Sequence, residues 1–101
     1  MDAQQLQRGL EAGEIVRLDR DDWDSCRDRF RVMERHDTGL RGELLIVAGA
    51  AGLAVVEEPS TVERVVRPLP SLQAARELLA DRLATYDRMW DGCGCKIDYY
   101  R

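Results

Sequence analysis

Two cysteines near the end of the chain are the residues most capable of chemistry. Cys93 and Cys95 stand one residue apart in the segment Asp-Gly-Cys-Gly-Cys-Lys, so their thiols could chelate a soft metal or exchange with a disulfide. A structural zinc site normally takes four ligands in recognisable pairs. The further candidates are Cys26 and His36, and Cys26 or a second subunit would have to complete the set.

The same segment also fits a structural interpretation. If it is extended, Cys93, Cys95, Ile97 and Tyr99 fall on one face of a strand, where free cysteines behave as small apolar side chains. A thiol just after a helix C-terminus also meets the negative end of the helix dipole, which disfavours the reactive thiolate. We therefore favour structural thiols and keep a thiol-dependent metal-binding or redox protein as the alternative.

Three arginines four residues apart form a second candidate site. Arg27, Arg31 and Arg35 would line one side of a helix and could bind an acidic partner. Asp24 and Asp28 are interleaved with them, so local ion pairing on a solvated face is the simpler account. Aromatic residues suit interfaces, and they add three candidate partner contacts near the end of the chain: Trp90, Tyr99 and Tyr100.

Composition narrows the class of protein. The chain has 101 residues, 45% hydrophobic and 34% charged, which is typical of one globular domain spanning residues 1–101. Its net charge of −4 disfavours nucleic-acid binding, which usually needs a basic face. The odd number of cysteines favours a reducing, cytoplasmic setting, and neither a signal peptide nor a membrane span is expected. Arginine outnumbers lysine fourteen to one, which indicates a GC-rich, bacterial genome.

Hydrophobic spacing and turn residues predict the elements that must position these groups. We expect an α+β fold with two layers, in which an antiparallel sheet packs against two or three helices. The sheet would contain a three-stranded meander and one or two short strands. The expected helices cover residues 2–12, about 19–35 and 71–91, and the expected strands cover residues 14–18, 42–48, 53–57, 61–67 and 96–100.

No catalytic constellation accompanies these apolar elements, so we predict no catalytic residue. A small-molecule enzyme or sensor with a pocket between helices and sheet stays open as a third alternative, because a pocket needs only shape and a few polar groups from distant positions. The expected function is that of a small non-enzymatic accessory or protein-interaction domain, acting as a homodimer. Its contact surface would be the long C-terminal helix, the hairpin from Leu44 to Glu57, or the aromatic tail. No cofactor is expected unless the two tail cysteines bind zinc or another soft metal.

Overall fold

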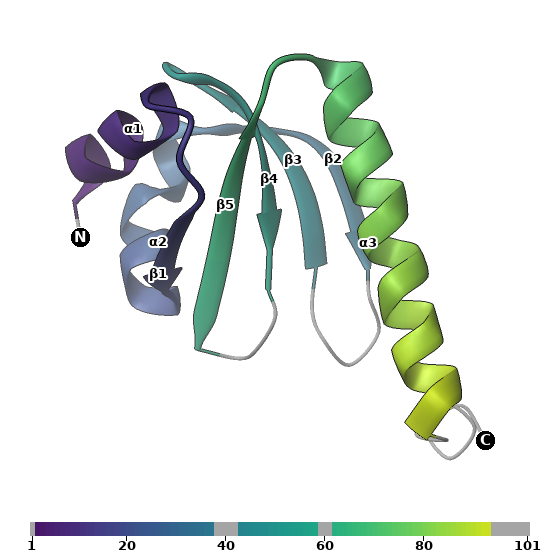
Figure 1. Cartoon of the computed structure of the whole chain (residues 1–101). Coiled ribbons are helices and arrows are strands. Elements are labelled where there is room, and N and C mark those ends of the chain that lie inside the picture. The colour runs from purple at the N-terminus through teal and green to yellow at the C-terminus, as the bar shows by residue number, and fades with distance from the viewer. Residues whose placement is uncertain (1, 38–42, 59–61, 94–101) are drawn as a thin grey trace.

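A five-stranded antiparallel sheet forms the centre of the protein (Figure 1). The computed structural model describes residues 2–37, 43–58 and 62–93, with residues 87–93 as backbone only. The strand order is β1-β5-β4-β3-β2. The strands are β1 (Val16–Asp19), β2 (Arg31–Asp37), β3 (Glu43–Gly49), β4 (Gly52–Glu57) and β5 (Glu63–Leu69), and the α-helices are α1 (Ala3–Glu11), α2 (Arg20–Cys26) and α3 (Leu72–Cys93). The predicted α+β fold and its antiparallel meander are confirmed.

Side-chain caps fix where the three helices begin. The Asp2 carboxylate accepts a hydrogen bond from the backbone N–H of Gln5 at 2.8 Å, and Asp19 accepts one from Asp22 at the start of α2, also at 2.8 Å. Ser71 Oγ accepts from the N–H of Ala74 at 3.1 Å. Each cap satisfies a donor that the first helical turn cannot pair internally.

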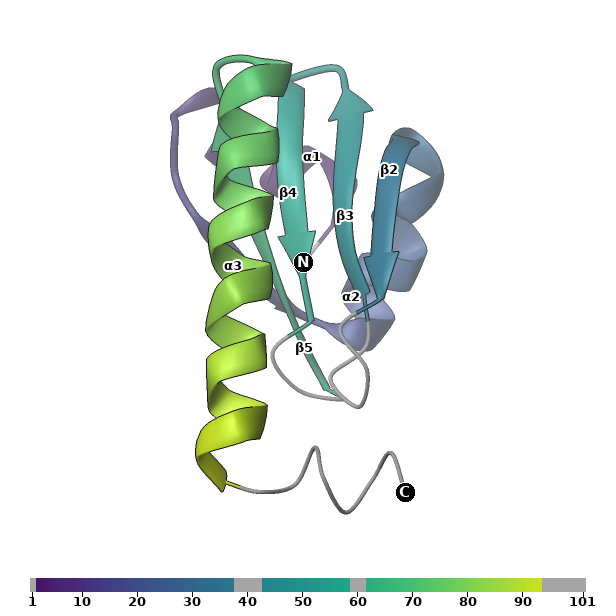
Figure 2. The same cartoon turned by 90° about the vertical axis from the view of Figure 1, so that its right-hand side faces the viewer.

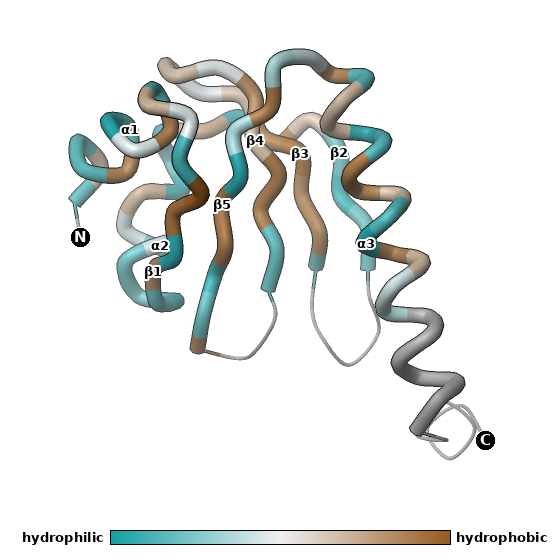
Figure 3. Tube along the Cα trace, in the orientation of Figure 1, coloured by the Kyte–Doolittle hydropathy of each residue, from teal (hydrophilic) through white to brown (hydrophobic). Residues whose placement is uncertain are grey.

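The apolar run in β3 serves both faces of the sheet. Leu45 and Val47 belong to a core shared with α1 and α2, whereas Leu44 and Ile46 belong to a core shared with α3. We call these the α1/α2 face and the α3 face; Figure 2 looks onto α3 lying across the second of them. Figure 3 shows that the central strands, which are covered on both faces, are apolar, whereas the edge strand β2 is mostly hydrophilic.

Residues 31–37 form a strand, so the predicted helix over residues 19–35 is wrong in its second half. After α2 a short 3-10 turn, Arg27–Arg29, leads directly into β2. The helical spacing of Trp23, Cys26, Phe30 and Met33 would put Met33 on the buried face of that helix, but Met33 is 40% exposed. The physical reason is pairing with β3, which supplies β2 with a ladder of backbone hydrogen bonds, and such tertiary contacts override local helical spacing.

Trp23 and Cys26 do share the buried face of α2, as their spacing predicts. The ring of Phe30, beyond the helix, still packs against Trp23, with centroids 5.4 Å apart. None of the helices in the described ranges is both long and apolar enough to cross a lipid bilayer.

Candidate interaction surface

A buried carboxylate marks the contact between α3 and the sheet. Glu57, the last residue of β4, is only 1% exposed. Its Oε2 accepts hydrogen bonds from Arg82 Nη2 at 2.6 Å and Arg82 Nε at 3.1 Å. The Tyr86 hydroxyl also donates to Oε2, and Arg67 Nη1 donates to Oε1. We call these four residues the Glu57 cluster, and in it a buried charge meets the paired donors that burial requires.

Strand register and helical spacing bring the four side chains together. Arg67 in β5 lies opposite Val55 in β4, and Glu57 is two residues beyond Val55, so all three share the α3 face. Arg82 and Tyr86 are four residues apart and therefore neighbours on one side of α3. The Arg82 guanidinium also lies over the Tyr86 ring, 5.6 Å from its centroid.

The pKa shifts of Glu57 and Tyr86 suit a structural contact that holds α3 on the sheet rather than an acid–base pair. Burial alone would raise the pKa of Glu57, but hydrogen bonds from Arg82, Tyr86 and Arg67 outweigh it and hold the pKa below its ordinary value. Burial, together with the hydrogen bond to Glu57, raises the pKa of Tyr86 to about 12. Near neutral pH the carboxylate is thus ionised and the phenol protonated, far from the conditions under which either would exchange protons efficiently.

Helix α3 continues past the sheet that it packs on. Its 22 residues span about 33 Å, whereas the seven residues of β3 span about 23 Å. Tyr86 already reaches the end of β4 through Glu57, and Figure 1 shows the C-terminal turns of α3 running beyond the strands. The backbone turns formed by residues 87–93, which we call the α3 extension, therefore continue beyond the described strands.

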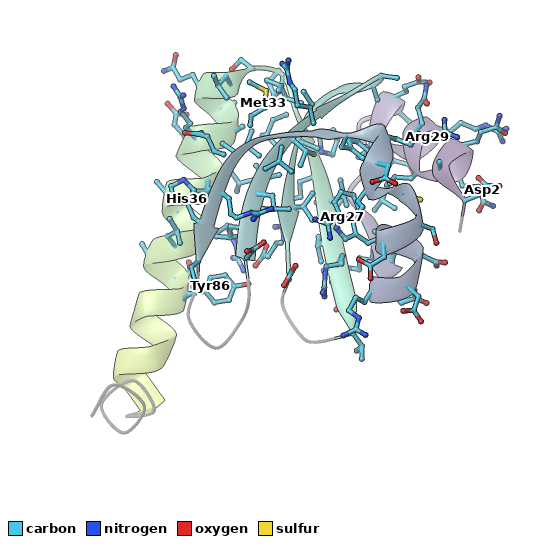
Figure 4. All side chains as sticks on the ribbon, turned by 180° about the vertical axis from the view of Figure 1, so that it is seen from behind. Asp2, Arg27, Arg29, Met33, His36 and Tyr86 are labelled. Atoms are coloured by element: carbon cyan, nitrogen blue, oxygen red, sulfur yellow. The ribbon has the colours of Figure 1, made fainter. Side chains whose placement is uncertain are left out.

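The structure separates the cysteine and histidine candidates. Cys26 is fully buried in the core of the α1/α2 face, and burial, reinforced by the charge of Asp22, raises the pKa of its thiol. Cys93 is the last residue of α3, which packs on the opposite face. His36 lies opposite Leu44 and thus on the α3 face, beside α3 in Figure 4. Within the described ranges, no three His, Cys, Asp or Glu side chains cluster as a metal site.

Cys95, Tyr99 and Tyr100 lie outside the described residues, as does the last predicted strand. A metal or redox function of Cys93 and Cys95 therefore stays a prediction. The backbone of Trp90 belongs to the α3 extension.

The three arginines do not share a helix face, because the helix that would have aligned them ends early. Arg27 belongs to the 3-10 turn, whereas Arg31 and Arg35 lie in β2 opposite Ala48 and Leu45, which puts them on opposite faces of the sheet. Arg27 lies 3.9 Å from Asp24, and Arg35 lies 3.5 Å from Glu43. The predicted arginine stripe is thus divided into separate surface residues, of which Arg27 and Arg35 have local acidic neighbours.

The hairpin from Leu44 to Glu57 was another expected contact surface. It forms the centre of the sheet, and most of its side chains are buried on one face or the other. Of the three surfaces expected from the sequence, the long helix is the one that the described structure leaves partly outside the core.

Sequence reasoning missed the Glu57 cluster. Two signals were present: Glu57 directly follows the apolar pair Val55 and Val56, and Arg82 falls on the same helical stripe as Leu79 and Tyr86. A charged residue on each of two apolar surfaces indicates a buried ion pair.

Together, the sheet, the helices on its two faces and the projecting α3 define a small α+β domain with a fastened C-terminal helix. Comparisons with protein-family models, curated protein sequences and solved structures find no match to this chain.

Proposed function

We propose that this protein is a small non-enzymatic accessory domain that binds protein, first of all a second copy of itself, through the α3 extension. The observation that carries the proposal is the length of α3, which continues past the end of the sheet. Isolated helical turns are marginal in water, so contact with another chain would stabilise them.

The Glu57 cluster supports this proposal because it fixes how α3 leaves the sheet. Arg82 and Tyr86 both bond Glu57, and they lie within the last two turns before the extension begins at residue 87. A contact surface held in one orientation loses less conformational entropy on binding. The helical stripe that contains Leu79 and Tyr86 reaches Trp90 in the sequence, and tryptophan is a frequent interface residue.

We place the protein in the cytoplasm. The support is its odd number of cysteines, one of which, Cys26, is a free thiol inside the core. Secreted proteins of this size more often use their cysteines as disulfides.

Sedimentation equilibrium of the purified chain tests the proposal. We expect a dimer for the wild type and a monomer for Trp90→Arg, with unchanged far-ultraviolet circular dichroism. The matched control is Gln4→Arg, which adds the same charge at an exposed position on α1 and should leave the dimer intact. A wild-type monomer at high micromolar concentration, or a Trp90→Arg dimer as stable as the wild type, would contradict the proposal.

A further inference from the structure

A small cavity lies on the opposite side of the sheet from α3. It has a volume of about 100 Å³ and opens between α1, the residues before β2 and the turn joining β3 to β4. Its apolar lining includes Leu10, Phe30 and Ala51, and its polar lining consists of Gln4, Gln7 and Arg29. Apolar walls with a few polar groups are the usual composition of a ligand site.

Small residues in β3 and the following turn shape this cavity. A Cβ at Gly49 would lie only 2.7 Å from the Phe30 ring, so the ring can pack here because glycine has no side chain. Ala50 and Ala51 follow, and both line the cavity. Leu10, 5% exposed, adds an apolar surface from α1. The apolar part of the cavity therefore combines Leu10 of the core with Phe30 and the short turn between β3 and β4.

The polar lining carries a positive charge. Arg29 has an exposed side chain, and no hydrogen bond or ion pair to it occurs within residues 2–37, 43–58 and 62–86. Figure 4 shows Arg29 beside α1. Gln7 donates through Nε2 to Glu11 Oε1 at 2.9 Å, so Arg29 is the charged donor of this lining. A guanidinium with unused donors is suited to a carboxylate, which it can bind through two parallel hydrogen bonds.

We propose that this cavity binds a small aliphatic carboxylate. The volume corresponds to roughly three water-sized groups, which suits a branched tail of three carbons against Phe30 and Leu10. The carboxylate then pairs with Arg29 at the mouth. This chemistry occurs both in a free short-chain acid and in the C-terminal residue of a peptide that ends in a small aliphatic side chain.

Titration of the isotope-labelled full chain, followed by amide chemical shifts, tests the proposal with isobutyrate as the probe. We expect saturable shifts at residues lining the cavity, with roughly millimolar affinity for so small a ligand. Isobutyramide, which has the same shape without the charge, should bind about tenfold more weakly. N-acetylvaline distinguishes the two sources: tighter binding than isobutyrate indicates a peptide C-terminus, and weaker binding indicates a free acid.

Two variants locate the site. Arg29→Gln removes the charge and Ala51→Leu fills the cavity, and each should weaken isobutyrate binding at least about tenfold. The control Arg20→Gln removes an exposed arginine that lines another surface and should leave the affinity within about twofold.

Absence of saturable shifts in the wild type, or unchanged affinity in both Arg29→Gln and Ala51→Leu, would overturn the carboxylate site. Because the cavity lies on the face away from α3, Trp90→Arg should bind isobutyrate normally. The carboxylate site and the proposed self-association are therefore tested independently of each other.

Discussion

The two faces of the sheet are joined to their helices in different ways. On the α1/α2 face, apolar side chains such as Leu6, Trp23 and Cys26 make up the buried contact. On the α3 face, a smaller apolar set that includes Ala75 and Leu79 is supplemented by the buried, charged Glu57 cluster.

The two kinds of contact restrict the orientation of their helices to different degrees. Apolar burial is strong but non-directional, so it stabilises the α1/α2 face without demanding one hydrogen-bonding geometry. The bonds from Arg82 and Tyr86 to Glu57 are directional, and they fix the rotation and axial position of α3. A helix that projects beyond its sheet needs such positioning more than a helix that ends over it.

Removing the largest buried side chain of the α1/α2 face should have the largest effect. Trp23 is 3% exposed, and Trp23→Ala should lower the free energy of unfolding by about 4 kcal/mol through lost burial and the cavity left behind. Urea denaturation measures this loss. Ile15→Ala, at a side chain 57% exposed, is the control and should change stability by less than about 0.5 kcal/mol. A loss under about 1 kcal/mol for Trp23→Ala would show that this face is not the main apolar contact.

Neutralising the carboxylate of the Glu57 cluster should cost somewhat less. Glu57→Gln keeps the side-chain size but leaves Arg67 and Arg82 without their counter-charge. Breaking a buried pair typically costs several kcal/mol. The Arg67 and Arg82 side chains are 22% and 28% exposed, so we expect a loss of about 2 to 3 kcal/mol after hydration is allowed for. Urea denaturation measures it.

The matched control removes a surface carboxylate of the same sheet face. Glu63 pairs with Arg17 at 3.1 Å, with side chains 38% and 63% exposed, so Glu63→Gln should cost less than about 1 kcal/mol. Equal losses in Glu57→Gln and Glu63→Gln would mean that the buried Glu57 cluster contributes no more to the free energy of unfolding than an exposed ion pair.

The sequence was sufficient for the elements whose local and tertiary preferences agree. Helices were expected to begin at residues 2, about 19 and 71, and the structure caps its helices at Asp2, Asp19 and Ser71. Such starts can be read from sequence because a cap depends on neighbouring residues alone. The apolar run of β3 likewise predicted a central strand.

Prediction failed where the structure depends on contacts between segments that are distant in the sequence. β2 looked helical because Trp23, Cys26, Phe30 and Met33 recur at helical spacing, and its pairing with β3 cannot be seen in that local pattern. The Glu57 cluster was missed for the same reason, since Arg82 lies 25 residues from Glu57 in the chain. The cavity beside Arg29 depends on α1, the end of the 3-10 turn and the β3–β4 turn, so no single motif encodes it.

The smallest expected effect is a loss of stability at alkaline pH that depends on Tyr86. Its pKa in the folded protein is about 12, above the value of about 10 expected in the unfolded chain. The folded state therefore holds the phenolic proton more tightly. Its contribution is fully present below pH ~10 and is lost as the pH rises toward ~12, a change of about 2 kcal/mol.

Denaturation curves of the wild type and Tyr86→Phe over this pH range measure the effect. Phenylalanine cannot donate to Glu57 or titrate, so the variant should be less stable than the wild type at pH ~8 and the two should converge toward pH ~12. Parallel curves would show that the Tyr86 proton does not help to fasten α3. In that case the directional character of the α3 face would rest on the two guanidiniums of Arg67 and Arg82 that donate to Glu57.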